Sequence, residues 1–277
     1  MKSPLKFSRN ILASSGWPWL YKLHKGVYVL VFHDISEEQR AKLKELIHYL
    51  RHSFNIISPD EFSTYSSDGP AYILSFDDGF YCQFRTACEV LDPMGIKALF
   101  FVCPIFINSD GDKAHKFVVD NFKLTKAKGA FSKDYLPMTW EQIKSLIGMG
   151  HTIGAHTMNH ARLSLVNDAE CLEWEIAESG DECERMLGRK VDWFAYPLGD
   201  VASIDNRSSQ IIRRRYRYCC SSIRGINSIS SNPFGILRQT MDMDKDLKYL
   251  KMVAKGGLDL YYYLDRLKLE KMITRRS

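Results

Sequence analysis

The amino-acid sequence predicts an α/β fold, a distorted (β/α) barrel of about seven parallel strands. Short apolar stretches rich in β-branched and aromatic residues alternate with amphipathic stretches along most of the 277 residues. Strands that alternate with helices are parallel strands joined by helical crossovers. We see no glycine-rich nucleotide-binding turn after the expected strands, which favours a barrel over an open doubly wound sheet.

Seven stretches have the composition of strands. They cover residues 26–34, 71–76, 97–104, 151–157, 191–199, 218–222 and 234–242. In barrels of this kind the catalytic groups lie where strands end and loops begin. We therefore expect the polar residues at the ends of these stretches to share one cavity.

The segments between the strands have the apolar spacing of helices. Residues 36–54 begin with Ser36 as an N-cap, and residues 139–150 begin with Thr139 and end at a glycine. The other expected helices cover residues 81–95, 168–189, 209–217, 245–257 and 258–276.

We expect a single domain, because we see neither an internal repeat nor a low-complexity linker. Residues 104–137 are the main insertion and are expected to lie over the barrel mouth. The expected parts of this single domain are the barrel core 27–240, an N-terminal extension 1–26, the insertion 104–137 and C-terminal helices 245–277.

Composition restricts the partners. The hydrophobic fraction of 45% is sufficient for a large core, and the net charge of +5 is too small for a dedicated nucleic-acid binder, so we expect no nucleic-acid partner. The seven cysteines form no CxxC pair, which is typical of reduced, buried thiols. We see no clean signal peptide and no apolar stretch of membrane-spanning length, so we expect a cytoplasmic protein.

The C-terminal segment 260–276 mixes aromatic, apolar and basic residues. Such a segment could rest on the anionic inner face of a membrane, where lipid-linked sugar precursors are found. The alternative is a helix that packs against the barrel and exposes a basic end. The composition of the segment favours this alternative.

The main chemical signal is the pair Asp77 and Asp78, which follows an apolar strand and precedes Gly79. Gly79 permits a turn that lets both carboxylates face one cavity. Two carboxylates in one cavity resist double ionisation unless a positive charge lies nearby, and a metal ion supplies that charge.

His156 and His160 follow the expected strand 151–157. A separation of four residues would place both imidazoles on one side of a helical turn. With Asp78 they would provide three metal ligands and leave positions open, as in a catalytic site, while Asp77 stays free as a general base. Either motif alone is more typical of a solvated turn or of an exposed helix face.

These motifs resemble the polysaccharide deacetylase family, the NodB-homology deacetylases. The resemblance covers about residues 27–240 through "ILSFDDGF", "VLDPMGIKALFFV", "MTWEQIKSLIGMGHTIGAHTMNHARLS" and "WFAYPLG". It implies a distorted (β/α) barrel and a divalent ion, usually Zn²⁺, that serves in the removal of N-acetyl or O-acetyl groups from sugars. By position it makes Asp77 the catalytic base and makes Asp78, His156 and His160 the metal ligands.

The third motif departs from the family pattern. Ala195 stands where the family has an arginine that orients the base, and Leu198 replaces an aromatic residue. Variants of this kind resemble branches that act on exopolysaccharide, lipopolysaccharide or capsule sugars. Backbone N–H groups of the loop could still stabilise an oxyanion. That loop consists of Tyr196, Pro197, Leu198 and Gly199.

The last motif also departs, because the family's histidine on the final strand is absent. Arg238 lies there and could supply the cation that is missing at Ala195; an exposed ion pair is the alternative. Arginine is not an acid near neutral pH, so His33 is our candidate for the general acid. A structural histidine bonded to Asp34 is the alternative for His33.

The sequence thus predicts a metal-dependent hydrolase, a polysaccharide or sugar deacetylase. Its substrate would be an N-acetylated (or O-acetylated) sugar of a glycan or glycan precursor, with Asp77 as base. Two alternatives stay open: a deformylase or other amidohydrolase that acts on a lipid-linked sugar, and a carbohydrate-binding protein that has lost catalysis.

Overall fold

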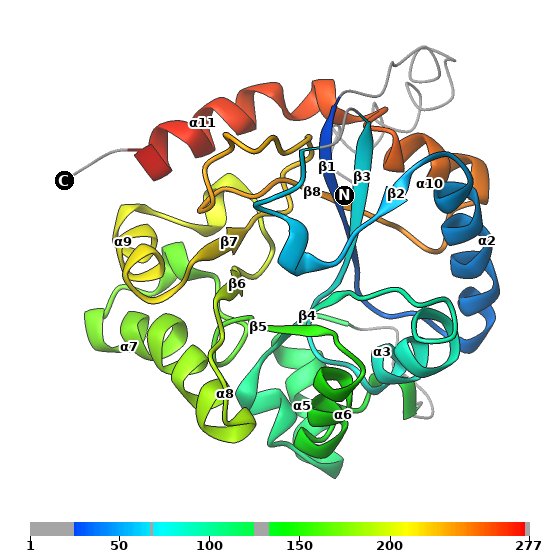
Figure 1. The fold of residues 1–277 in the computed structure, drawn as a ribbon. Helices are drawn as coiled ribbons and strands as arrows, with labels where there is room; N and C mark the ends of the chain where they lie inside the picture. Colours follow the sequence, from blue (N-terminus) through cyan, green and yellow to red (C-terminus); the bar gives the residue numbers. More distant parts are fainter. Residues whose placement is uncertain (1–24, 67–68, 125–132, 275–277) are drawn as a thin grey trace, which may run out of the picture.

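Seven parallel strands form the centre of the protein in a computed structural model, which describes residues 25–66, 69–124 and 133–274 (Figure 1). Their order is β7-β6-β5-β4-β3-β1-β8, and a two-residue strand, β2 (Asn55–Ile56), pairs with β3 outside this path. The seven are β1 (Gly26–Phe32), β3 (Pro70–Phe76), β4 (Leu99–Val102), β5 (Thr152–Ala155), β6 (Trp193–Ala195), β7 (Tyr218–Cys220) and β8 (Arg238–Thr240).

The barrel is nearly closed between β7 and the segment that leads into β8. A parallel bridge joins Cys220 to Ile236, and the Ile236 N–H donates to the Cys219 carbonyl at 2.9 Å. On the other side, β8 pairs with β1 in parallel. The predicted seven-stranded (β/α) barrel is confirmed.

Helices surround the barrel, as Figure 1 shows. Capping boxes at Ser36 and Thr139 start α2 and α6, as the sequence predicts. The helices are α2 (Glu37–Ser53), α3 (Tyr81–Thr86), α4 (Pro104–Ile107), α5 (Gly111–Asp120), α6 (Trp140–Gly148), α7 (Ala169–Glu173), α8 (Ser179–Leu187), α9 (Asn206–Arg215), α10 (Leu247–Ala254) and α11 (Tyr263–Thr274). None of these helices is both long and apolar enough to span a bilayer.

Two of the predicted helices contain a π-helical turn. Residues Ala87–Leu91 continue α3, and Trp174–Glu178 join α7 to α8, so the predicted helix 168–189 is continuous but locally widened by a π-helical turn. Short 3₁₀ turns cover Pro59–Glu61, Lys133–Tyr135, Leu163–Leu165, Val201–Ser203 and Asp259–Tyr262.

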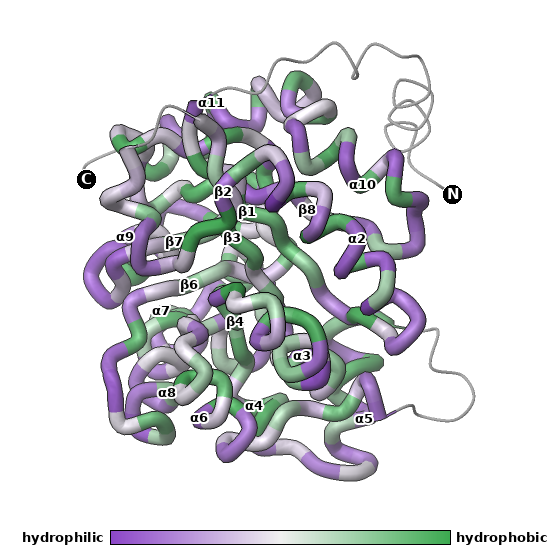
Figure 2. The backbone as a smooth tube through the Cα atoms, turned by 45° about the vertical axis from the view of Figure 1, so that its right-hand side comes forward, coloured by the Kyte–Doolittle hydropathy of each residue, from purple (hydrophilic) through white to green (hydrophobic). Residues whose placement is uncertain are grey.

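The core has two layers because strand residues alternate between the two faces of the barrel wall. Figure 2 shows the hydrophobic strands inside a more hydrophilic outer surface. The outward-facing residues pack under the helices and include Leu30, Leu74 and Phe100. The inward-facing residues fill the barrel and include Val29, Ile73, Leu99, Phe101 and Trp193.

The insertion contains structure that the sequence pattern did not indicate. Residues 104–137 include α4 and α5, and Phe106, Phe117 and Phe122 form an aromatic cluster there. Residues 125–132 of the insertion, and 1–24 of the expected N-terminal extension, lie outside the described residues. All seven cysteines are free thiols, and Cys171 is exposed.

Candidate active site

A cavity of about 480 Å³ opens where the barrel strands end. It brings together residues that are far apart in the sequence, because the carboxyl ends of parallel strands meet at one face. The lining consists of His33, Asp34, Gln39, Asp77, Asp78, Phe80, Phe122, Leu124, His156, His160, Leu198, Ser222, Thr240, Met241, Asp242, Met243 and Asp244.

Strand alternation directs the key side chains into the barrel. On β3 the inward positions are Ala71 and Ile73, and the same period continues to Asp77 just beyond the strand. The same alternation carries β1 from Val29 to His33 and β5 from Gly154 to His156. The sequence period of two therefore explains why these residues share the cavity.

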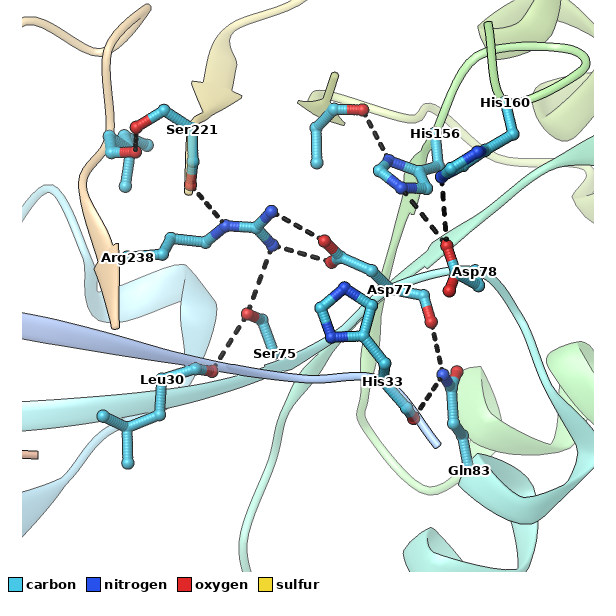
Figure 3. A network of polar contacts seen from close by, with 12 residues as sticks. Leu30, His33, Ser75, Asp77, Asp78, Gln83, His156, His160, Ser221 and Arg238 are labelled. Atoms are coloured by element: carbon cyan, nitrogen blue, oxygen red, sulfur yellow. Dashed lines mark hydrogen bonds and ion pairs between the residues drawn. The ribbon is translucent and has the colours of Figure 1, made fainter. Parts of the chain in front are cut away.

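Asp77 is paired with Arg238 of β8. Two parallel bonds of 2.7 Å run from Nη1 and Nη2 of Arg238 to Oδ1 and Oδ2 of Asp77 (Figure 3). Arg238 Nε donates to the Ser221 carbonyl at 2.7 Å, and Nη1 lies 3.4 Å from Ser75 Oγ. Arg238 is completely buried, so the alternative of an exposed ion pair is wrong.

The ion pair determines the charge state of Asp77. Burial alone would raise the pKa of this carboxyl group, because a charge is costly in a low-dielectric interior. The charge and hydrogen bonds of Arg238 outweigh burial, and the pKa of Asp77 lies below its ordinary value. Asp77 is therefore a carboxylate at neutral pH.

Asp78, His156 and His160 form a group that could hold a metal ion. One ligand atom from each residue lies within 4.8 Å of the others. Nε2 of each histidine lies 3.5 Å from Asp78 Oδ1, as Figure 3 shows. Ligand atoms of one tetrahedral Zn²⁺ lie about 3.3 Å apart, so these separations are compatible with a shared ion.

The histidine tautomers fit this interpretation. Nδ1 of His156 lies 2.7 Å from the Ala195 carbonyl, and Nδ1 of His160 lies 3.2 Å from the Asn121 carbonyl. A carbonyl only accepts, so each Nδ1 carries the proton and each Nε2 turns a lone pair toward Asp78. Asp78 Oδ1 is buried without a hydrogen-bond partner among the described residues, which a cation would relieve.

The pKa values of Asp78 and His160 agree with a metal-ligand set, whereas that of His156 is raised, because burial is outweighed by its contact with Asp78 and by the charge of Asp77. Burial opposes ionisation of Asp78, but the hydrogen bond of His156 and the charges of His160 and His33 outweigh it and hold its pKa at about 2. Burial lowers the pKa of His160 to about 4, so its imidazole is neutral at pH 7. Metal ligands need an ionised carboxylate and neutral imidazoles.

The predicted helical turn between the two histidines is wrong. Residues 156–160 form a loop, in which Thr157 (φ 60°) and His160 (φ 57°) adopt left-handed backbone conformations. Asp78 (φ 85°) and Gly79 (φ 90°) do so in the facing loop. Non-glycine residues in this region are strained and are frequent at functional sites.

Two neighbours hold the histidine loop in place. The Glu175 carboxylate accepts the Asn159 N–H at 3.0 Å, and the Glu175 carbonyl accepts the Met158 N–H at 3.0 Å. From the insertion, Asn121 Nδ2 donates to the Asn159 carbonyl at 2.9 Å. The insertion therefore reaches the site and also contacts His160 through its backbone.

His33 lies at the same cavity. Its backbone carbonyl accepts a bond of 2.9 Å from Gln83, which also donates to the Asp77 carbonyl. Its ring lies near the Asp77 carboxylate (Figure 3), and its charge contributes to lowering the pKa of Asp77. Asp34, the alternative partner expected for His33, instead accepts the Tyr135 hydroxyl at 3.2 Å.

Hydrogen bonds fix the conformation of the loop after β6. The Tyr196 hydroxyl donates to the Gly199 carbonyl at 3.1 Å, and that carbonyl also accepts the Ser222 N–H at 2.9 Å. A Cβ at position 199 would lie 2.2 Å from Ser222 Oγ, so only glycine fits. Leu198 is 56% exposed and lines the cavity, whereas Tyr196 and Pro197 are buried.

Sequence reasoning missed several residues at the site. Glu175 carried a signal, since it lies beside Ile176 on the buried side of a helix where a carboxylate is unusual. Asn121 carried no signal in the sequence, because its contact with His160 uses a backbone carbonyl. Asp34, Gln39, Asp242 and Asp244 line the cavity but belong to no motif.

Comparison with known proteins identifies the family. The family model described as polysaccharide deacetylase matches residues 65–215, about half of the chain. A Bacillus subtilis (strain 168) protein named "Putative polysaccharide deacetylase YxkH" is 23% identical over an alignment of 182 residues, which covers 62% of this chain and 56% of that protein. This chain thus spans little more than half the length of that curated relative.

Solved structures share the fold. Streptococcus pyogenes deacetylase PplD, solved in complex with acetate, is 17% identical with a TM-score of 0.64, covering 84% of this chain and 99% of that one. IcaB from Ammonifex degensii is 20% identical with a TM-score of 0.65, covering 85% and 98%. Because the family model matches more than half of its residues, this chain belongs to the polysaccharide deacetylase family, as its motifs predict.

Proposed function

We propose that this protein is a metal-dependent hydrolase that removes the N-acetyl group from a sugar of a glycan. One observation carries the proposal. A single cavity holds both the Asp78–His156–His160 group and an ionised Asp77 that Arg238 holds in place. Family membership supports acetylated sugars as the substrate class.

Asp78, His156 and His160 would hold a divalent cation, for which we propose Zn²⁺. When bound, such an ion supplies a Lewis acid that polarises the acetyl carbonyl and lowers the pKa of water to about 7. The remaining steps belong to the side chains of this protein.

Asp77 accepts the proton of the attacking water. Each of its oxygens accepts one bond from Arg238 and keeps a further lone pair for this proton. Because Arg238 depresses the pKa, Asp77 stays ionised and available across the neutral range. The guanidinium also fixes the carboxylate plane, which positions the base.

His33 delivers a proton to the nitrogen that leaves. The water oxygen forms a bond to the acetyl carbon, the C–N bond breaks, and acetate and a sugar amine are the products. The amine leaves poorly without a proton, so an acid at this cavity is needed. Backbone N–H groups of Tyr196, Leu198 and Gly199 are the proposed donors to the oxyanion, since Pro197 has no N–H.

The test compares the wild type with Asp77→Asn and His156→Ala. We expect Asp77→Asn to retain the bound metal but to lose turnover by about 10²–10⁴-fold, because it removes only the proton acceptor. We expect His156→Ala to lose both the bound metal and turnover, because it removes a metal ligand. Metal content by mass spectrometry and acetate release from N-acetylglucosamine oligomers measure the two effects.

Circular dichroism of each variant is the control for folding. Asn at position 77 leaves the buried Arg238 without its counter-charge, which could destabilise the fold. Loss of turnover therefore supports the role of Asp77 only in a variant that is folded and retains metal. Turnover near the wild-type rate in Asp77→Asn would contradict the role of Asp77. Metal binding undiminished in His156→Ala would contradict the ligand set.

A further inference from the structure

The two strands that lead to His33 and Asp77 separate just where these residues begin. β1 and β3 pair in parallel up to Phe32 and Phe76, and the Asp77 N–H then donates to the Phe32 carbonyl at 3.0 Å. Beyond this bond the two chains lead to different helices, β1 to α2 and β3 to α3. The strand ladder therefore ends at the residues that carry the proposed acid and the proposed base.

One side chain connects the two chains beyond the ladder. Gln83, in the first turn of α3, is completely buried. Its Nε2 donates to the His33 carbonyl at 2.9 Å and also to the Asp77 carbonyl (Figure 3). Because a carbonyl only accepts and the amide nitrogen has two N–H groups, each N–H can serve one strand end. The Asp77 carbonyl belongs to the peptide group that leads to Asp78, so the second bond also fixes the start of that turn.

The oxygen of the same amide has no partner. Gln83 Oε1 is buried and makes no hydrogen bond within the described residues. An unpaired buried acceptor is unfavourable, and an apolar side chain of similar length would avoid it. A residue that only filled space would therefore be better as methionine than as glutamine. The unpaired oxygen indicates that the two N–H groups of Gln83 are what this position requires.

From these contacts we propose that Gln83 is a positioning residue, which sets the spacing between the His33 side chain and the Asp77 carboxylate. The inference rests on the proposed function, in which Asp77 takes a proton from water and His33 gives one to the amine. Both side chains must face the same scissile bond, and a displacement of about 1 Å can lower the rate about 10²-fold. Gln83 does not line the cavity, so it acts through the backbone of the two residues.

The test variant is Gln83→Met, which removes both donors at similar side-chain length and introduces no unpaired polar group of its own. Thr86→Val is the matched control on the same helix. Thr86 is also completely buried, and its hydroxyl donates to the Cys82 carbonyl at 2.8 Å. The control therefore removes a buried bond from a side chain to a carbonyl, but this carbonyl lies within α3 and not at a strand end.

The first measurement is kcat and KM for acetate release from N-acetylglucosamine oligomers, with each protein saturated with Zn²⁺ and its metal content checked. We expect Gln83→Met to lower kcat about 10–100-fold and to change KM less than about twofold, because alignment in the transition state is lost while the cavity lining is kept. Thr86→Val should retain kcat within about twofold. An unchanged kcat in folded Gln83→Met would overturn the proposal, as would a rise in KM alone.

Crystal structures of the metal-free proteins test the spacing without turnover. We expect the His33 backbone in Gln83→Met to shift relative to Asp77 by about 1 Å or to adopt more than one conformation, whereas Thr86→Val should superimpose on the wild type. Unchanged positions of both residues in Gln83→Met would overturn the proposal. If the wild type releases no acetate, the proposed function fails, and the crystal structures still decide whether Gln83 sets this spacing.

Discussion

At the residue scale, the notable feature is the origin of the cation that holds Asp77. The family resemblance places an arginine at position 195, and this chain has alanine there at the end of β6. Arg238 instead reaches Asp77 from β8 with two bonds of 2.7 Å. Both positions face the inside of the barrel, so the cation can come from either strand.

This arrangement predicts the effect of removing Arg238. Arg238→Met fills a similar volume but leaves Asp77 as an unpaired charge at 2% exposure. Breaking a buried pair from one side costs about 3–5 kcal/mol, so the free energy of unfolding should fall by that amount. Urea unfolding of the metal-free protein at neutral pH measures it.

The double variant Arg238→Met/Asp77→Asn is the control for this prediction. It removes the unpaired charge, so it should recover part of the lost stability relative to Arg238→Met. Additive losses in the double variant would show that the two residues do not form an energetic pair.

At the element scale, a π-helical turn positions the histidine loop. The turn Trp174–Glu178 shifts the helical register, and the Glu175 carbonyl accepts the Met158 N–H instead of serving only its own helix. The Glu175 carboxylate accepts the next N–H, that of Asn159. These two bonds fix the strained loop that carries His160.

We therefore expect Glu175 to affect metal affinity without contacting the metal. Glu175→Leu leaves the Asn159 N–H unpaired, and the affinity for Zn²⁺ or Co²⁺ should fall about 10–100-fold. Glu175→Gln keeps an acceptor oxygen and should retain most of the affinity. Glu178→Leu on the exposed side of the same turn is the matched control.

Competition with a chromogenic chelator measures these affinities. A loss of stability in Glu175→Leu with unchanged affinity would mean that Glu175 serves the fold only. Equal losses in Glu175→Leu and Glu175→Gln would contradict the role of the hydrogen bond.

The elements also show what sequence reasoning can reach. Strands and capped helices were predictable because their signals are local, as at Ser36 and Thr139. The loop 156–160 was mistaken for a helical turn, because its left-handed residues depend on partners such as Glu175 that lie elsewhere in the chain. The spacing of His156 and His160 identified both residues as candidate ligands, but it did not predict the backbone conformation of the loop that joins them.

At the scale of the whole molecule, barrel topology explains why the candidate site could be assembled from the sequence at all. Parallel strands must end at one face, so the residues after β1, β3 and β5 were expected to meet. The presence of Asp242 and Asp244 at the cavity was not predictable, because these residues reach it through a loop whose course no local pattern encodes. Motifs identify the reacting centre, and tertiary structure adds the groups that surround it.

The opposite end of the barrel predicts how the whole fold responds to acid. His151, just before β5, is 3% exposed, and its Nδ1 accepts the Ala98 N–H at 3.0 Å. Burial, with help from the charge of Lys97, lowers the pKa of His151 to about 4. Its pKa in the unfolded chain is near 6.5, so between these values the unfolded state binds more protons.

The free energy of unfolding should therefore decrease as the pH falls from about 6.5 toward 4, by at most about 3 kcal/mol from this residue. His151→Asn keeps an acceptor for the Ala98 N–H but cannot take up a proton, so its stability should depend less on pH in this window. Chemical denaturation of both metal-free proteins at several pH values measures the difference, which isolates His151 from the carboxylates of the cavity. Parallel curves for the two proteins would mean that His151 does not couple protonation to folding, and acid sensitivity would then have to come from the cavity end of the barrel.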